Sequence, residues 1–412
     1  MMSRDHQRAS EPTTMSKSLR SQYLVHASPQ TKIKVSLLAK AMADALGGPA
    51  EFRTRFGFKL VTEMIRNKTF GLDPGTWTDD TSMALCLARS IAKGVTKKVG
   101  KRVGGFDQID QLNAYGMWWQ AGYLSATGDC FDIGATVRTA LGVYIEALKE
   151  GEPEEGLAKI KEQLSGEMCA GNGSLMRVLP VGLAYWRCEE GKDESEEGEN
   201  GIWREYARRS SETTHPNPMC VEACELWVGA IVRIMRGNAR GTSMTKLDLL
   251  QYFATFPYTS EVLKASLALS MPSPNSVDAA EVEEHYSRHH PILKLIVDTA
   301  KLPPSETNPL NLPTKKELPS SGYVLDTLVA ALYCFFSTQT FKEGAITAVN
   351  LGNDADTIGA VYGGLAGCWY GSETDGEHFW SEAVKEWGQV LVKRSLVEQI
   401  AQELVEFDES RV

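Results

Sequence analysis

Apolar residues recur at helical spacing along most of the chain. Three segments show it most clearly, each with apolar residues one helical turn apart: Val35, Leu38, Met42 and Ala45; Met83, Cys86, Leu87 and Ile91; and Leu325, Leu328, Leu332 and Phe335. This spacing places side chains on one face of an α-helix, whereas a half-buried strand alternates every second residue. Alternating segments are scarce here. The pattern therefore predicts an all-α fold.

The helical pattern lapses in two places, 187–202 and 270–321. The first is rich in Glu and Gly and the second in Pro, which favours loops. We expect both to be insertions in a single helical domain over residues 31–408, the second with one short helix at about 289–300. Residues 1–30 are polar and predict a disordered N-terminal tail without the apolar segment of a secretion signal.

Composition narrows the classes of partner. The 412 residues carry a formal net charge of −10, so there is no basic footprint for nucleic acid or an anionic membrane. The longest charge-free apolar stretch, 357–372, is too short to span a bilayer. Eight scattered cysteines are typical of reduced core residues rather than a disulfide framework. We expect a soluble intracellular protein, cytoplasmic in the first instance, while basic residues in the tail leave the nucleus or mitochondrion open.

Two acidic clusters, nearly 280 positions apart in the chain, carry the strongest chemical signal. Thr78, Asp79 and Asp80 precede one predicted helix, and Asp354, Asp356 and Thr357 precede another. Taken singly, each cluster is explained by helix capping, because Thr and Asp satisfy free amide groups at a helix start. A cap needs one side-chain oxygen, however, and each cluster offers several. Hard divalent cations such as Mg²⁺ bind oxygen ligands of this kind, so two clusters that meet could hold a pair of ions.

Glycine recurs every fourth residue behind the second cluster, at Gly359, Gly363, Gly367 and Gly371. On a helix these positions form one stripe without side chains, which lets another backbone approach closely. We therefore predict tight helix packing behind Asp354 and Asp356 that holds them rigidly.

Three further candidates lie in predicted loops. Gly171-Asn172-Gly173-Ser174 precedes an apolar segment, as a phosphate-binding turn does, although it lacks the P-loop lysine and an ordinary turn is the alternative. His215 precedes Pro216, taken as a helix start, where a histidine is commonly a cap or a core hydrogen-bonding group. Glu51 follows Gly47-Gly48-Pro49 and is either a mobile carboxylate or a surface residue.

These segments, in this order, resemble the ADP-ribosylglycohydrolases. The resemblance covers about residues 32–371 and rests on an ordered set of motifs: Asp44-Ala45-Leu46-Gly47 with Glu51, Trp77-Thr78-Asp79-Asp80-Thr81, Gly171-Asn172-Gly173-Ser174-Leu175-Met176-Arg177, Thr214-His215, Ser321-Gly322-Tyr323-Val324-Leu325-Asp326-Thr327-Leu328 and Asp354-Ala355-Asp356-Thr357. The chain departs from the family pattern at Ala43 and Asn353, where glycine is common.

The resemblance implies a compact, single-domain orthogonal bundle of helices with two Mg²⁺ ions, or Mn²⁺ in their place. Glu51, Asp79 and Asp356 would be catalytic, with Asp356 bridging the ions. The implied metal ligands are Thr78, Asp79, Asp80, Asp354, Asp356 and Thr357. Gly171, Asn172, Gly173 and Ser174 would take the pyrophosphate, while His215, Gly322 and Tyr323 would line the nucleotide site.

The function implied is metal-dependent cleavage of the glycosidic bond between ADP-ribose and an acceptor, which releases ADP-ribose. An ADP-ribosylated protein or a small ADP-ribosyl conjugate would be the substrate, and a monomer is expected. The chemistry fits, since paired cations can orient ribose hydroxyls and activate water while a carboxylate moves the proton. Two alternatives stay open: a catalytically idle ADP-ribose-binding relative, and a two-metal nucleotide phosphoesterase.

Overall fold

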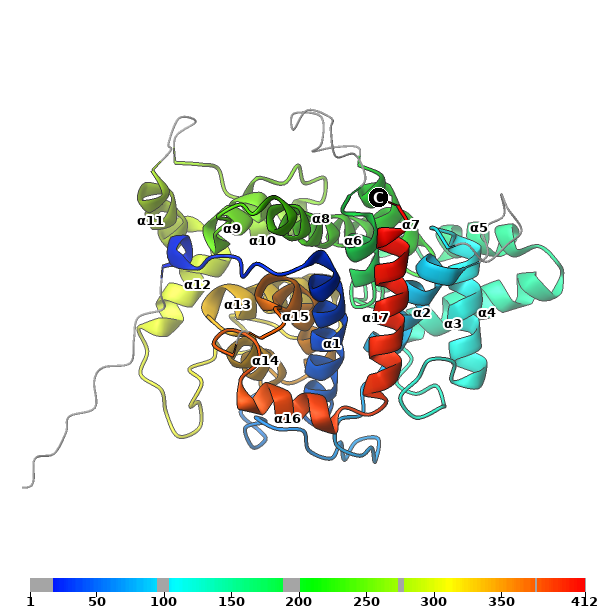
Figure 1. Cartoon of the computed structure of the whole chain (residues 1–412), viewed down its shortest axis with the longest axis horizontal. Coiled ribbons are helices and arrows are strands. Elements are labelled where there is room, and N and C mark those ends of the chain that lie inside the picture. The colour runs from blue at the N-terminus through cyan, green and yellow to red at the C-terminus, as the bar shows by residue number, and fades with distance from the viewer. Residues whose placement is uncertain (1–17, 95–103, 188–200, 273–277, 375, 412) are drawn as a thin grey trace, which may run out of the picture.

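The computed structural model describes residues 18–94, 104–187, 201–272, 278–374 and 376–411, and their regular secondary structure is helical (Figure 1). They contain isolated β-bridges but no named strand, which confirms the predicted all-α fold. The α-helices are α1 (Pro29–Gly47), α2 (Asp79–Lys93), α3 (Gln108–Ala121), α4 (Ala135–Lys149), α5 (Pro153–Gln163), α6 (Leu179–Tyr185), α7 (Ile202–Glu212), α8 (Pro218–Arg240), α9 (Lys246–Thr255), α10 (Glu261–Leu267), α11 (Ala279–His289), α12 (Pro291–Ala300), α13 (Val324–Ser337), α14 (Phe341–Val349), α15 (Ala355–Tyr370), α16 (Glu382–Val390) and α17 (Arg394–Glu409).

Helix α1 is the central element. It lies between α15 and α17 in Figure 1 and packs against both. Pro29 occupies the first turn, and the Ser28 side chain accepts a hydrogen bond from the Thr31 amide, so the helix begins with a proline and a cap. Most of α1 is buried on every side. This helix therefore organises the core and fixes the elements that surround the site.

The glycine stripe of α15 faces α1. A methyl group on Gly363 would lie 2.6 Å from the Ala39 carbonyl oxygen, and one on Gly359 would lie 2.5 Å from the Ala43 carbonyl oxygen. Any side chain at these two positions would force the helices apart. The predicted tight packing behind the second acidic cluster is confirmed. The same stripe leaves room for the methyl group of Ala43, which a methyl group on Gly363 would approach to 2.9 Å.

The predicted insertion at 270–321 contains two helices, not one. Helix α12 matches the expected helix, whereas α11 was missed. Only Val282 and Tyr286 are buried on α11, and two apolar residues one turn apart are too weak a periodic signal. Residues 273–277, and 188–200 of the other predicted insertion, lie outside the described residues.

The predicted N-terminal tail was too long. Its first seventeen residues lie outside the described part, but Leu19 and Leu24 are buried and the Leu24 amide donates to the Met244 carbonyl oxygen. Residues 18–28 therefore pack against the helical core. Seven cysteines are described and all are free thiols, in agreement with the prediction for them. Within the described residues, no helix has the length and apolar character needed to cross a membrane.

Candidate active site

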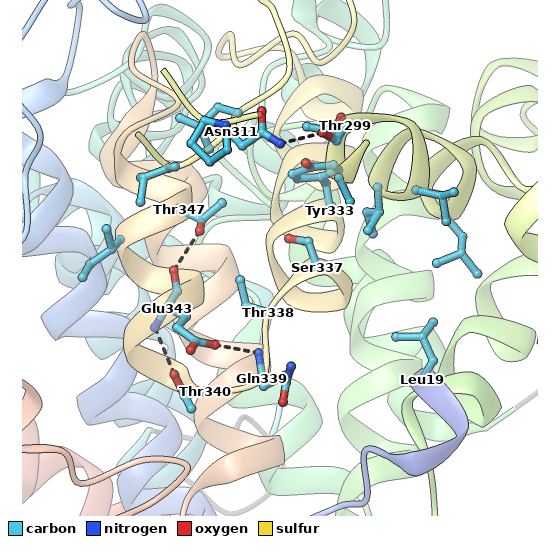
Figure 2. A pocket seen from close by; sticks show the side chains of 18 of the residues that line it. Leu19, Thr299, Asn311, Tyr333, Ser337, Thr338, Gln339, Thr340, Glu343 and Thr347 are labelled. Atoms are coloured by element: carbon cyan, nitrogen blue, oxygen red, sulfur yellow. Dashed lines mark hydrogen bonds between the residues drawn. The ribbon is translucent and has the colours of Figure 1, made fainter. Parts of the chain in front are cut away.

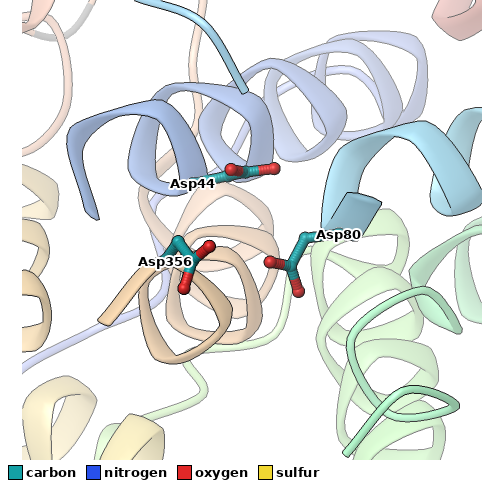
Figure 3. A group of neighbouring side chains, drawn as sticks. All are labelled: Asp44, Asp80 and Asp356. Carbon is teal, nitrogen blue, oxygen red and sulfur yellow. The ribbon is translucent and has the colours of Figure 1, made fainter. Parts of the chain in front are cut away.

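The two acidic clusters meet where α2 and α15 begin. Thr357 donates a hydrogen bond of 3.2 Å to Asp80 across 277 positions of the chain. Asp356, on the first turn of α15, faces Asp80 on the first turn of α2, and both face Asp44 of α1 (Figure 3). The convergence predicted from the sequence is therefore present.

Asp44 caps helix α2, a role that the sequence analysis offered as the alternative for the first cluster. One of its carboxylate oxygens accepts hydrogen bonds of 3.0 Å from the Thr78 amide and hydroxyl, and the other accepts from the Thr81 amide at 3.0 Å and hydroxyl at 2.6 Å. Neither Thr78 nor Asp354, the N-cap residues of α2 and α15, makes a side-chain capping bond. Because a carboxylate from α1 caps α2, the acidic side chains that begin α2 are not needed as caps and can bind another group.

Several carboxylates of the site lie close together without hydrogen-bond partners for all their oxygens. Asp44, Asp80 and Asp356 offer oxygens within 4.8 Å of one another, and so do Glu51, Asp132 and Asp356. One oxygen of Asp80 (Oδ1) and one of Glu51 (Oε2) are buried with no hydrogen-bond partner. A buried, unpaired carboxylate oxygen is costly unless a cation or proton meets it. The residues present therefore fit a divalent cation, with Asp356 common to both groups.

Burial and mutual repulsion shift the titration of these carboxylates. Burial, followed by neighbouring carboxylates, raises the pKa of Glu51 to about 10 and the pKa values of Asp44, Asp132 and Asp354 to about 7. Burial also raises the pKa values of Asp79, Asp80 and Asp356. All seven pKa values are raised, because these carboxylates lie close together where water is excluded. A bound cation would relieve this repulsion.

One buried cation of the protein lies beside the cluster. The Lys40 ammonium is 1 % exposed and donates to the Met176 carbonyl oxygen at 2.6 Å. Burial lowers its pKa, and Asp80 and Asp44 act in the opposite direction. The Lys40 ammonium group alone does not neutralise seven carboxylates, so the cluster can still accept a bound cation.

Glu51 is a buried member of the site. Its side chain is 2 % exposed, which rules out the surface alternative. Its segment is tied to the start of α15, since the Phe52 amide donates to the Asn353 carbonyl oxygen and the Asn353 amide donates to that of Arg53. The predicted movement of this segment stays a prediction.

The loop Gly171–Ser174 joins the cluster through Asn172. The Asn172 amide side chain donates to Asp354 at 2.5 Å and to Thr327 at 2.8 Å, and its backbone amide donates to the Gly322 carbonyl oxygen. Gly171 also forms a β-bridge with Tyr323. These bonds place Gly322 and Tyr323 next to the loop, as expected.

His215 lies directly behind this loop. A methyl group on Gly173 would lie 2.7 Å from a ring carbon of His215, so this position requires glycine. The ring shares a 2.8 Å hydrogen bond with Thr214, and burial lowers the pKa of His215 to about 3, which makes the imidazole neutral at physiological pH.

One local expectation at these loops was wrong: helix α8 begins at Pro218 with Asn217 as its cap, not at Pro216. The Ser174 hydroxyl accepts a hydrogen bond from Ser211 in the core, and α6 begins only at Leu179. Gly171, Asn172 and Gly173 line the cavity, and the place of Ser174 in the pyrophosphate loop stays a prediction.

The clusters and the loop border one cavity of about 520 Å³. Its lining joins elements from across the chain: Glu51, Phe52, Asp79, Asp132, Ile133, Gly134, Ala135, Thr136, Val137, Gly171, Asn172, Gly173, Met176, His215, Ser321, Gly322, Asn353, Asp354 and Thr357. Phe52, Asp132 and Asn353 have positive φ angles of 58°, 58° and 63°. Residues other than glycine rarely adopt this conformation, and it concentrates at functional sites. Asparagine tolerates this conformation better than most residues other than glycine, which suits Asn353 to its position.

Asp132 is the functional candidate that the sequence analysis missed. It lies in an irregular segment between α3 and α4, where no periodic pattern draws attention to an aspartate. Its proximity to Glu51 and Asp356 arises only from the tertiary fold.

A larger cavity of about 1150 Å³ lies elsewhere, bordered by α12, α13, α14 and the segment 299–312 (Figure 2). None of the predicted site residues lines it. Its Glu343 carboxylate is satisfied by the Gln339 amide at 3.0 Å.

Comparison with known proteins agrees with this geometry. Residues 26–411 match the family model described as ADP-ribosylglycohydrolase. The chain is 28 % identical over 373 residues to ADP-ribosylarginine hydrolase Tri1 of Pseudomonas putida, covering 90 % of this chain and 77 % of that protein. It is 26 % identical over 340 residues to ADP-ribosyl-[dinitrogen reductase] glycohydrolase of Rhodospirillum rubrum, covering 82 % and 84 %. A solved structure titled ADP-ribosylglycohydrolase-related protein complex aligns with a TM-score of 0.56 at 28 % identity, covering 92 % and 99 %.

Proposed function

Because the chain belongs to the ADP-ribosylglycohydrolase family and is a hydrolase of ADP-ribose linkages, we propose that it cleaves the bond between the distal ribose and an acceptor with the help of two divalent cations. The observation that supports this most directly is the pair of buried, unpaired carboxylate oxygens on Asp80 and Glu51. Oxygen-only surroundings favour Mg²⁺, with Mn²⁺ as the alternative.

The proposed ligands would come from the starts of the two helices, and Asp356, which belongs to both groups of close carboxylates, could serve both ions. These ligands are Thr78, Asp79, Asp80, Asp354, Asp356 and Thr357. When bound, such ions polarise the ribose hydroxyls and lower the pKa of a water molecule. Asp44 holds the first ligand group in place through its four hydrogen bonds to Thr78 and Thr81. This support is rigid because α1 is anchored on the α15 glycine stripe.

Glu51 is proposed to hold and move the proton of the reaction. Cleavage at the anomeric carbon requires a group that exchanges a proton with water or with the departing acceptor. Burial of Glu51, and after it the nearby Asp132 carboxylate, raises the pKa of Glu51 and so favours its protonated form. Asp79 lines the cavity beside them, and with Asp356 it completes the proposed catalytic group.

The nucleotide is proposed to extend from this centre along Gly171, Asn172 and Gly173. A glycine-containing loop lets backbone amides approach a pyrophosphate without side-chain obstruction. Neutral His215 supports the loop from below and adds no charge. Gly322 lines the cavity, and Tyr323, 37 % exposed, follows it and bridges to Gly171; both are proposed to border the nucleotide.

The acceptor proposed is the guanidinium group of an arginine, on a protein or in a small conjugate. One relative's name specifies ADP-ribosylarginine and another's specifies dinitrogen reductase. We also propose that the active species is a monomer, since every residue assigned a role lies on one chain.

The test is product analysis on matched peptides that carry ADP-ribose on arginine or on serine, with Mg²⁺, with Mn²⁺ and with excess EDTA. The proposal expects free ADP-ribose and intact peptide from the arginine-linked substrate, and no turnover in EDTA. AMP as the product would indicate the phosphoesterase alternative, and ADP-ribose binding without any product would indicate the idle relative. Undiminished turnover after confirmed metal removal would overturn the metal mechanism.

A further inference from the structure

An aromatic cluster lies at the rim of the site cavity. Phe52, Phe70 and Phe131 come from three separate segments, with ring centroids 6.2 Å apart for Phe52 and Phe70 and 5.8 Å apart for Phe70 and Phe131. Phe70 and Phe131 are half-buried, while Phe52 lines the cavity and is 62 % exposed. A phenylalanine this exposed needs an explanation, because large apolar groups usually leave solvent.

Two of these rings are chain neighbours of the carboxylates that approach each other in the cavity. Phe52 follows Glu51, and Phe131 precedes Asp132. The backbone is left-handed at both Phe52 and Asp132, each with φ of 58°, which is unfavourable for these residues. This conformation directs the chain so that a carboxylate lies in the cavity while a ring remains at its rim.

The position of the rings matches the position of the acceptor. In the proposed function the nucleotide lies along Gly171–Gly173, a loop joined to the cluster through Asp354. In the same proposal the bond to be cleaved lies at the carboxylates, and the acceptor extends from that bond within the cavity that Phe52 lines. Glu51 and Asp132 form the part of the cluster to which the rings are attached.

We infer that Phe52, supported edge-on by Phe70 and by Phe131 behind it, is the acceptor-recognition surface, on which the planar guanidinium group of an ADP-ribosylated arginine stacks. This inference rests on the proposed function and adds residues that determine its specificity. An aromatic face attracts a planar cation, and the attraction strengthens as water is excluded. A neutral serine-linked peptide gains contact with the ring but not this electrostatic attraction.

The test compares Phe52→Leu, which keeps apolar bulk without a π face, and Phe52→Tyr, which keeps the face. Since Phe52 is exposed, neither change disturbs the core. Phe52→Leu should lower kcat/KM on the arginine-linked peptide by about 5- to 30-fold, the range of a cation–π contact, with unchanged affinity for free ADP-ribose by calorimetry. Phe52→Tyr should stay within about 2-fold of wild type, and Phe131→Leu should show a smaller loss.

Two competitive inhibitors test whether the positive charge of the guanidinium group is what Phe52 recognises. N-acetylarginine amide should inhibit the wild type more strongly than its citrulline counterpart, which has nearly the same shape but no charge, and Phe52→Leu should remove most of this difference. The matched control is Tyr23→Leu, another exposed aromatic residue, 56 % exposed, that does not line the cavity. It should leave all of these values unchanged.

Two results would overturn the inference. One is equal inhibition of the wild type by the two competitors, and the other is a wild-type kcat/KM for Phe52→Leu on the arginine-linked peptide. Either can occur while the wild type still releases ADP-ribose, in which case only the role of Phe52 is wrong. If the wild type cleaves neither linkage, the proposed function itself fails.

Discussion

The two cavities differ in whether they leave a buried carboxylate oxygen unpaired, since the larger has an unpaired buried atom only on the neutral Ser381 hydroxyl among its described residues. The larger, of about 1150 Å³, contains a carboxylate, Glu343, that accepts a hydrogen bond from a backbone amide (Figure 2). The smaller, of about 520 Å³, is bordered by Glu51, whose buried Oε2 atom has no partner, and beneath it lies the equally unpaired Oδ1 of Asp80. Volume alone would point to the wrong place. The chemistry is indicated by buried charge that the protein does not balance itself.

Backbone strain separates the cavities in the same way. Phe52, Asp132 and Asn353, all with positive φ, line the smaller cavity, whereas among the described residues the larger one includes only Asn311 in this conformation. Strained residues persist where the surrounding structure holds them for a purpose. Both observations lead to predictions in which the smaller cavity is the proposed active site and the larger cavity serves as the control.

The largest expected effect is that of Asp356→Asn. An amide cannot supply the charge that two cations would share, so turnover should fall by at least about 10⁴-fold, to the level of the EDTA-treated wild type. The metal-free variant should melt at or above the temperature of the metal-free wild type, because one repelled carboxylate is gone. Single-turnover assays with calorimetric melting test both parts. A variant with substantial activity would contradict the bridging role.

Glu51→Gln should have the next largest effect. Loss of the proton-carrying group should lower the rate roughly 10²- to 10⁴-fold while ADP-ribose still binds, because glutamine keeps the shape of the side chain. Titration calorimetry beside a single-turnover assay separates binding from chemistry. If binding and rate fell in equal measure, Glu51 would act in affinity and not in catalysis.

The stability of the metal-free protein should fall as the pH rises through 7. The pKa values of Asp44, Asp132 and Asp354 are raised to about 7 in the folded protein from an ordinary 3.8, so the metal-free folded state keeps protons that the unfolded chain releases. Their stabilising contribution is complete below about pH 4 and is lost as the pH rises through 7. Lowering the pH from 8 to 6 should raise the free energy of unfolding by about 1 to 4 kcal/mol without metal.

Saturating Mg²⁺ should stabilise the protein more at pH 8 than at pH 6, since the cation favours the ionised carboxylates. Thermal unfolding at both pH values, with Mg²⁺ and with EDTA, provides the measurement. Equal stabilisation by Mg²⁺ at the two pH values would argue against binding at these carboxylates.

The smallest expected effect comes from the larger cavity. Glu343→Gln weakens the hydrogen bond from the Gln339 amide and should cost less than about 1 kcal/mol of folding free energy, while kcat/KM stays within about 2-fold of wild type. The same assays as for Glu51→Gln apply. A large loss of activity would show that the larger cavity is coupled to the reaction.

Sequence reasoning succeeded where the signal was local and redundant. The surplus of oxygen ligands at 78–80 and 354–357 identified both clusters, and the four-residue glycine spacing identified the helix face that packs on α1. It failed at α11, which buries only two apolar side chains, and at Pro216, since helix α8 begins two residues later at Pro218.

The chain by itself determined the helical period, the ligand types and the close approach of α15, because each is written in neighbouring residues. The tertiary structure alone decided which carboxylates became available. Asp44 caps α2 from another helix, and this division of labour depends on the packing of α1 against the helix starts. Asp132 comes next to Glu51 from an irregular loop. Contacts of this kind leave no signal in neighbouring residues of the sequence, because they form only when distant segments pack together and bury these carboxylates away from water.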